Sequence, residues 1–276
     1  MKPFRSDEFN EGENAGLLDD IPFWSAPFGL KLLENIRYIP GITALDIGSG
    51  TGFPLLELAA RLGEGSSVYG IEPWKEMNAR SRAKIKGYGL TNVTLIEAEA
   101  ESLPFDDRSA DLIVSNNGIN NVQNRQQVIA ECSRVIKPGG QFIFTMNLDK
   151  SMFELYTVLE TVLAEMQLTR EIELMHQHIK SKRPSLDEMI NALRDNNFTI
   201  RALEHDQFNY RFATGTALLN HYFIRLAFMS AWVKLLPDDQ IQTIFDTIEE
   251  RLNEQSGTTN GINLSIPFVL IDAIKN

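Results

Sequence analysis

The chain has 276 residues, of which 43% are hydrophobic, so it can bury a sizeable core, and disorder over the whole length is excluded. Lysine and arginine number 26 against 37 aspartate and glutamate residues, and the resulting net charge of −11 argues against nucleic acid and against an anionic membrane surface as partners. The single cysteine, Cys132, allows no intramolecular disulfide and no cysteine-based metal cluster, which fits a reducing compartment such as the cytoplasm.

Neither a secretory signal nor a membrane span is predicted. Residues 1–15 form a polar stretch without the apolar core of a signal peptide. The longest apolar stretch, 217–236, contains His221 and Arg225, which are costly in a bilayer, so we expect a buried helix there and no membrane insertion.

An aromatic segment at 21–28 precedes a helical pattern, and from residue 42 short apolar runs alternate with helical patterns. The runs, predicted as strands, are 42–47, 67–71, 93–97, 111–115 and 141–146. The helical patterns between them are 53–63, 75–88 and 124–135. Because the runs are continuous rather than alternating, both faces of the sheet should be covered, which indicates a doubly wound α/β fold with a mostly parallel sheet.

After residue 146 the alternation ends. We predict helices at 152–170, 185–196, 214–235 and 238–255, extended segments at 198–202 and 208–212, and, after a polar loop at 256–261, a final strand at 263–273. Ser185 and Glu188 have capping-box spacing at the second of these helices. The helices that the sheet does not need are predicted to form a cap. The expected domains are a lid segment and helix at 1–40, an α/β core at 41–150, and the remaining strands with the cap at 151–276.

A glycine-rich motif follows the first predicted strand. It reads Asp46-Ile47-Gly48-Ser49-Gly50-Thr51-Gly52. The dinucleotide fingerprint Gly-x-Gly-x-x-Gly fails here, because its third glycine would fall on Phe53 or Leu55, and no P-loop lysine follows.

Four further segments share the order and spacing of one family. Glu72 lies 20 residues beyond Gly52 at the end of the second predicted strand, and the segments 98–105, 109–116 and 134–140 follow. With these, the sequence resembles class I S-adenosylmethionine (SAM)-dependent methyltransferases of the small-molecule, ubiquinone/menaquinone-biosynthesis type, closely over 42–148 and more loosely elsewhere. The resemblance implies a seven-stranded sheet with helical cap insertions, whose last two strands come from 198–212 and 263–273, the seventh antiparallel.

The resemblance also implies SAM as cofactor, with S-adenosylhomocysteine (SAH) as product, and a role for each matched residue. Gly48, Ser49, Gly50 and Gly52 would pass beside the methionine moiety, with Asp46 at its amino end and Asn116 near it. Glu72 would accept the ribose hydroxyls, Glu99 and Ala100 would contact adenine, and Pro73 and Trp74 would pack on the adenosine, although packing elsewhere is an alternative for Trp74. The family more often has Asp at the position of Glu99.

The acceptor is less defined by the sequence. Asn116-Asn117-Gly118-Ile119 lacks the prolines typical of enzymes that methylate DNA bases or protein glutamine, and one cysteine is too few for arsenite chemistry. We therefore expect a small-molecule acceptor. The candidate acceptor residues are Trp24, with Phe28, in a lid, and His221 and Arg225 on one helix face; the alternatives are core packing for Trp24 and structural roles for the other two.

Two functions from different classes follow. The first is methyl transfer from SAM to an unidentified small molecule, and the alternative is a non-catalytic protein that binds SAM or SAH and regulates or recruits a partner. A nucleotide-dependent oxidoreductase is disfavoured by the glycine spacing. No metal is expected, and the sequence is compatible with a homodimer.

Overall fold

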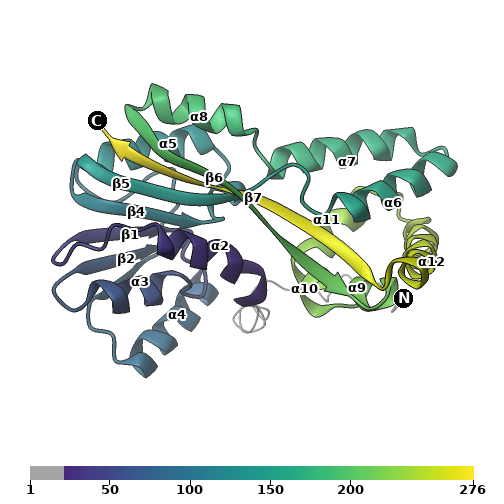
Figure 1. The fold of residues 1–276 in the computed structure, drawn as a ribbon, viewed down its shortest axis with the longest axis horizontal. Helices are drawn as coiled ribbons and strands as arrows, with labels where there is room; N and C mark the ends of the chain where they lie inside the picture. Colours follow the sequence, from purple (N-terminus) through teal and green to yellow (C-terminus); the bar gives the residue numbers. More distant parts are fainter. Residues whose placement is uncertain (1–21) are drawn as a thin grey trace. The chain divides into compact units, whose positions relative to one another are not determined.

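A single seven-stranded sheet organises the computed structural model, which describes residues 22–276 (Figure 1). The strand order is β3-β2-β1-β4-β5-β7-β6. The strands are β1 Thr43–Ile47, β2 Ser67–Ile71, β3 Val93–Ile96, β4 Ala110–Asn116, β5 Ile136–Asn147, β6 Phe198–Phe212 and β7 Ile262–Lys275. The first five pair in parallel, and β7 runs antiparallel to β5. The predicted class I methyltransferase fold is confirmed, including the antiparallel seventh strand.

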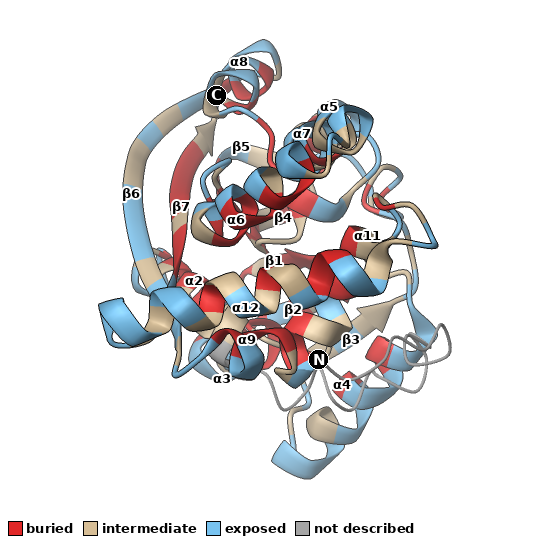
Figure 2. Ribbon diagram, turned by 90° about the vertical axis from the view of Figure 1, so that its right-hand side faces the viewer, coloured by how far each residue is buried: buried red, intermediate tan, exposed pale blue. Residues whose placement is uncertain are grey.

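Helices cover both faces of the sheet, as the continuous apolar strands predict. These helices are α2 Pro22–Glu34, α3 Leu55–Leu62, α4 Lys75–Tyr88, α5 Arg125–Val135 and α8 Leu186–Asp195. On one face Leu45 and Ile113 pack with Ile129 of α5 and Leu193 of α8. On the other, apolar residues of the same strands pack against α2 and α3. Figure 2 shows β7 buried along most of its length and the edge strand β6 largely exposed.

The chain divides into two compact units. The sheet unit comprises residues 22–148, Arg183–Asp206 and Phe268–Asn276, and the helical unit comprises Asp149–Lys182 and Gln207–Pro267. The helical unit contains α6 Phe153–Glu165, α7 Thr169–Lys182, α9 Gly215–Leu219, α10 Tyr222–Ile224, the π-helical turn η3 Arg225–Met229, α11 Ser230–Val233 and α12 Ile241–Thr259. Its core includes Trp232, whose Nε1 donates to the Tyr156 hydroxyl at 3.0 Å.

Several predicted elements need correction. The helix predicted at 152–170 is two helices, because Gln167 between α6 and α7 adopts a left-handed φ of +59° that ends a helix. The extended segments 198–202 and 208–212 are one continuous strand, β6. The polar loop expected at 256–261 is mostly helix, because the hydroxyls of Thr258 and Thr259 both donate to the carbonyl of Gln255 within α12.

The helix predicted at 214–235 is interrupted once, at Asn220 and His221, and its second part, 222–233, is continuous with a π-helical turn in its middle. The Asn220 amide donates to the Thr216 carbonyl and ends α9, and His221 is extended before α10 begins. His221 and Arg225 therefore do not lie on the face of one continuous helix. The aromatic segment predicted to precede a helix lies within α2 itself from Pro22 onward, whereas Ile21 and the predicted polar tail lie outside the described residues. None of the described helices is long and apolar enough to span a membrane.

Candidate functional site

The sheet reverses its winding direction between β1 and β4, its central neighbours. In open α/β sheets, ligands bind beyond the carboxyl ends of the strands at such a switch point. Asp46 lies at the end of β1, Glu72 directly follows β2, and Asn116 ends β4. The structure therefore brings these three predicted residues to one edge of the sheet unit.

The glycine loop joins β1 to α3 and leaves its backbone open. Gly48, Gly50 and Gly52 all have positive φ, at +74°, +53° and +106°. A Cβ at Gly52 would lie 2.9 Å from Leu56 Cδ1, so no larger residue fits there. Among residues 22–276, by contrast, nothing lies within 4 Å of a Cβ at Gly50. Gly50 is therefore the point at which a ligand can approach the loop backbone.

Asp46 is fully buried, and neither of its carboxylate oxygens has a hydrogen-bond partner among the described residues. Burial raises the pKa of Asp46 to about 8, and the nearby Glu72 charge adds to the rise. The backbone N–H of Leu55 opposes the shift without satisfying either oxygen. The adjacent Ser49 hydroxyl is also buried and unpartnered. A buried carboxylate without donors is costly, and a ligand ammonium group would compensate it.

Glu72 is also buried, but the fold supplies donors to its carboxylate. The Gly50 N–H donates to Oε2 at 3.0 Å and the Trp74 N–H to Oε1 at 3.2 Å. Burial nevertheless raises the pKa of Glu72, and the charge of Glu99 adds to this. Each oxygen retains a lone pair that can accept from a ligand hydroxyl.

The remaining predicted cofactor residues surround Glu72. Glu99 is exposed in the loop after β3, and its charge is close enough to act on Glu72. Ala100 is buried, Pro73 is half-buried, and Trp74 is 45% exposed at the start of α4. An exposed indole here can pack against a flat ligand, as predicted for adenosine.

Asn116 holds helix α2 in place. Its Nδ2 donates to the Ser25 carbonyl at 3.2 Å, and its Oδ1 accepts from the Thr145 hydroxyl at 3.1 Å. Of the two predicted lid residues, Phe28 is buried and packs edge-on against Phe268, with ring centroids 4.8 Å apart, whereas Trp24 is half-buried. Phe28 therefore anchors α2 to the sheet.

His221 and Arg225 belong to the helical unit. The His221 Nε2 lies 3.4 Å from the Tyr210 hydroxyl, and Nδ1 is buried without a partner among the described residues. Burial lowers the pKa of His221 and raises that of Tyr210 to about 12, so both groups are neutral at physiological pH. Arg225 begins the π-helical turn η3, a feature often found at functional sites.

Three polar residues of α4 that contact the glycine loop and Glu72 were missed by sequence reasoning. They are Asn78, Ser81 and Lys84. Because α4 is polar on most faces, their spacing in the sequence does not separate them from solvent-exposed neighbours.

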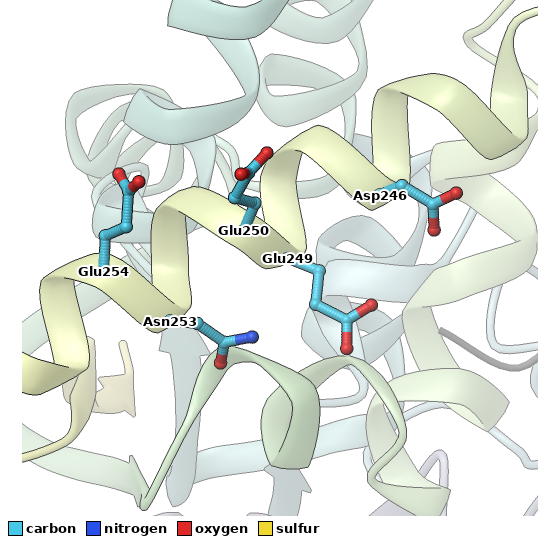
Figure 3. A pocket seen from close by; sticks show the side chains of 5 residues that line it. All are labelled: Asp246, Glu249, Glu250, Asn253 and Glu254. Atoms are coloured by element: carbon cyan, nitrogen blue, oxygen red, sulfur yellow. The ribbon is translucent and has the colours of Figure 1, made fainter.

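One surface hollow lies in the helical unit and carries acidic side chains. Its lining residues are Asp246, Glu249, Glu250, Asn253 and Glu254. Figure 3 shows that all five project from α12, to two sides of the helix. Acidic side chains along a helix are the normal solvent-exposed arrangement, so we assign this hollow no role. Within residues 22–276, no group of three or more His, Cys, Asp or Glu side chains could hold a metal ion.

Part of the chain matches a family of known proteins. Residues 45–144 match the family described as Methyltransferase domain. A demethylmenaquinone methyltransferase of Shouchella clausii is 38% identical over 103 residues, which cover 37% of this chain and 44% of that protein. The chain thus spans less than half the length of this curated relative.

Solved structures share the fold at low identity. A SAM-dependent methyltransferase from Aquifex aeolicus superposes with a TM-score of 0.54 at 22% identity, covering 70% of this chain and 92% of that one. A [4+2]-cyclase superposes with a TM-score of 0.57 at 17% identity, covering 90% and 80%. The resemblance to class I methyltransferases is confirmed: residues 45–144 match the methyltransferase domain, and the sheet is that of the class I fold.

Proposed function

We propose that the sheet unit binds SAM and that the protein transfers its methyl group to a small molecule. Because one neighbour with this fold is a cyclase, the reaction is defined by the residues of the site and not by the fold alone. The observation that carries the proposal is a pair of buried carboxylates. Asp46 has no hydrogen-bond partner among the described residues, and Glu72, which accepts from the open Gly50 backbone, keeps lone pairs for a ligand.

The residues fit the chemical groups of SAM one by one. Asp46 would take up the ammonium group, which compensates its buried charge. Glu72 would accept the two ribose hydroxyls, Glu99 and Ala100 would hydrogen-bond adenine, and Trp74 would cover the ring. Bound SAM supplies a methyl group on a sulfonium, a good leaving group, so the protein has mainly to orient donor and acceptor and exclude water.

For the acceptor we propose a small molecule of the menaquinone type, because the matched relative is named a demethylmenaquinone methyltransferase. Trp24, His221 and Arg225 are the proposed acceptor residues. His221, uncharged and with one unpartnered nitrogen, is suited to a hydrogen bond from or to an acceptor hydroxyl. The net charge of −11 disfavours a nucleic-acid acceptor. The buried, free Cys132 fits a cytoplasmic location.

Two measurements test the proposal. Calorimetric titration should show that SAH binds, competes with SAM, and is not displaced by NAD. Labelled SAM incubated with the protein and a metabolite extract should yield a labelled small molecule. SAH binding without any methyl transfer would favour the non-catalytic alternative, and binding of NAD would contradict the proposed site. Light scattering after gel filtration tests whether the protein is a homodimer.

A further inference from the structure

Helix α4 buries polar side chains where apolar ones would ordinarily be found. Its buried residues are Met77, Asn78 and Ser81, of which Asn78 is 1% exposed and Ser81 fully buried. Buried polar groups persist when they are hydrogen-bonded, so their partners indicate their purpose. Asn78, Ser81 and Lys84 are spaced three residues apart and fall along one side of the helix.

All three side chains donate to backbone carbonyls of the proposed cofactor site. Asn78 Nδ2 donates to the Glu72 carbonyl at 2.7 Å, and Ser81 Oγ donates to the Gly50 carbonyl at 3.1 Å. Lys84 Nζ donates to the Thr51 carbonyl at 2.9 Å. Successive turns of α4 therefore hold the strand end that carries Glu72 and the loop that carries Gly50.

These contacts close into a ring of hydrogen bonds. The Gly50 N–H donates to Glu72 Oε2, the Gly50 carbonyl accepts from Ser81, and Asn78, one turn earlier in α4, donates to Glu72. No atom of the described residues lies within 4 Å of a Cβ placed on Gly50, so hydrogen bonds rather than packing fix the loop on that side. The ring orients the Glu72 carboxylate before any ligand arrives.

Asn78 is a poor choice for stability alone. Its Oδ1 is buried and has no hydrogen-bond partner among the described residues. A leucine would fill similar space without an unsatisfied oxygen. We propose that Asn78 is a positioning residue, which holds Glu72 in the orientation that receives the ribose hydroxyls; this inference rests on the proposed SAM-binding function.

The test measures SAH affinity by calorimetry and the melting temperature for the full chain. Asn78→Leu should weaken SAH binding about tenfold. Its melting temperature should change little, because the substitution removes the unpaired Oδ1 but also the donor to the Glu72 carbonyl. A purely structural amide would lower the melting temperature and leave SAH affinity unchanged. If Asn78 acts through Glu72, the same substitution in a Glu72→Ala background should weaken binding by less than about twofold.

A matched control is Asn92, a second asparagine of the sheet unit, which is partly buried. Its Nδ2 donates to the carbonyls of Ala59 and Gly63, at 3.0 and 2.9 Å, and not to the glycine loop. Asn92→Leu should lower the melting temperature and leave SAH affinity unchanged. Ser81→Ala, which opens the same ring at Gly50, should weaken SAH binding several-fold and replaces Asn78→Leu if that variant does not fold.

The outcomes separate the two proposals. If the wild-type protein does not bind SAH, the proposed function fails, and the positioning role with it. If the wild type binds but Asn78→Leu binds equally well, or loses the same factor with and without Glu72, only the positioning role is overturned.

Discussion

Asp46 and Glu72, at the carboxyl ends of neighbouring strands, differ in the hydrogen bonds that their carboxylates accept. Asp46 receives no hydrogen bond from the described residues, whereas Glu72 receives two backbone N–H groups. Burial raises the pKa of both. Asp46 therefore lowers the stability of the ligand-free protein, as expected for a residue retained to meet a cationic group.

The raised pKa of Asp46 predicts a specific pH dependence. Between its ordinary pKa of 3.8 and its value of about 8 in the folded protein, the folded state retains a proton that the unfolded chain has lost. This contribution to stability therefore falls as pH rises from about 4 to about 8, by at most about 1.4 kcal/mol for each pH unit. Asp46→Asn abolishes the dependence. Urea unfolding at pH 5 to 8 should show the variant gaining on the wild type as pH rises; parallel curves would contradict the assignment.

Removing the Glu72 carboxylate should weaken cofactor binding. Glu72→Ala leaves two ribose hydroxyls without acceptors in a closed site and should cost about 1–3 kcal/mol in SAH affinity, measured by calorimetry. Glu57→Ala is the control, since Glu57 is exposed and pairs only at the surface with Arg61 at 2.8 Å. A folded Glu72→Ala protein with wild-type affinity would refute the ribose assignment.

At the scale of elements, α2 lies against the glycine loop only because one of its residues is a glycine. A Cβ on the buried Gly29 would lie 2.3 Å from Phe53 Cε1 and 3.0 Å from Asn116 Nδ2. The aromatic residues of this segment suggest a lid from the sequence, but the close approach at Gly29 depends on residues far away in the chain. It therefore has no local sequence signal.

Two glycine substitutions should have opposite effects. Gly29→Ala forces α2 away from Phe53 and should destabilise the protein by about 1–3 kcal/mol. Gly87→Ala, in α4 where no atom lies within 4 Å, should stabilise it by up to about 1 kcal/mol, because alanine is the better helix former. Chemical denaturation of both variants checks the prediction; equal effects of the two would show that α2 does not pack tightly at Gly29.

Elements that are determined by residues within the segment itself are predicted accurately, and elements that depend on tertiary packing are not. The strand at 67–71 and the helix at 75–88 agree with β2 and α4 because apolar runs, helical spacing and glycine ends all lie within the segment. The break at Gln167 and the π-helical turn at Arg225 were missed, since a left-handed residue and a wide turn are selected by packing within the helical unit.

At the scale of the whole molecule, the sequence motifs and the family match lie in only one of the two units, the sheet unit. The predicted cofactor residues from Asp46 to Asn116 all lie in the sheet unit, where the family match ends at residue 144. His221 and Arg225 lie in the helical unit, for which the sequence offers composition but no motif. A role for each cofactor residue could thus be predicted from its place in a motif. The two acceptor candidates could be predicted only because they are polar residues in an apolar segment.

This division predicts that cofactor binding and turnover can be separated by substitution. Arg225 begins the π-helical turn η3, which also contains Phe228. The Phe228 ring stacks with that of Trp232, with ring centroids 5.7 Å apart. Because π-helical turns often mark functional sites, we propose that the Arg225 guanidinium binds an acidic or electron-rich group of the acceptor. Arg225→Ala should then abolish turnover of the acceptor found in the labelling assay, leave SAH affinity unchanged, and shift Tm by less than about 2 °C.

The matched control for Arg225 is Arg251 on α12, in the same unit, which pairs with Glu165. Because such surface pairs contribute little, Arg251→Ala should retain both turnover and SAH binding. A large drop in Tm for Arg225→Ala, accompanied by lost turnover, would instead mean that the guanidinium holds the helical unit together. Lost turnover at wild-type Tm and wild-type SAH affinity would assign Arg225 to the acceptor side of the reaction, because the proposed cofactor residues lie in the other unit.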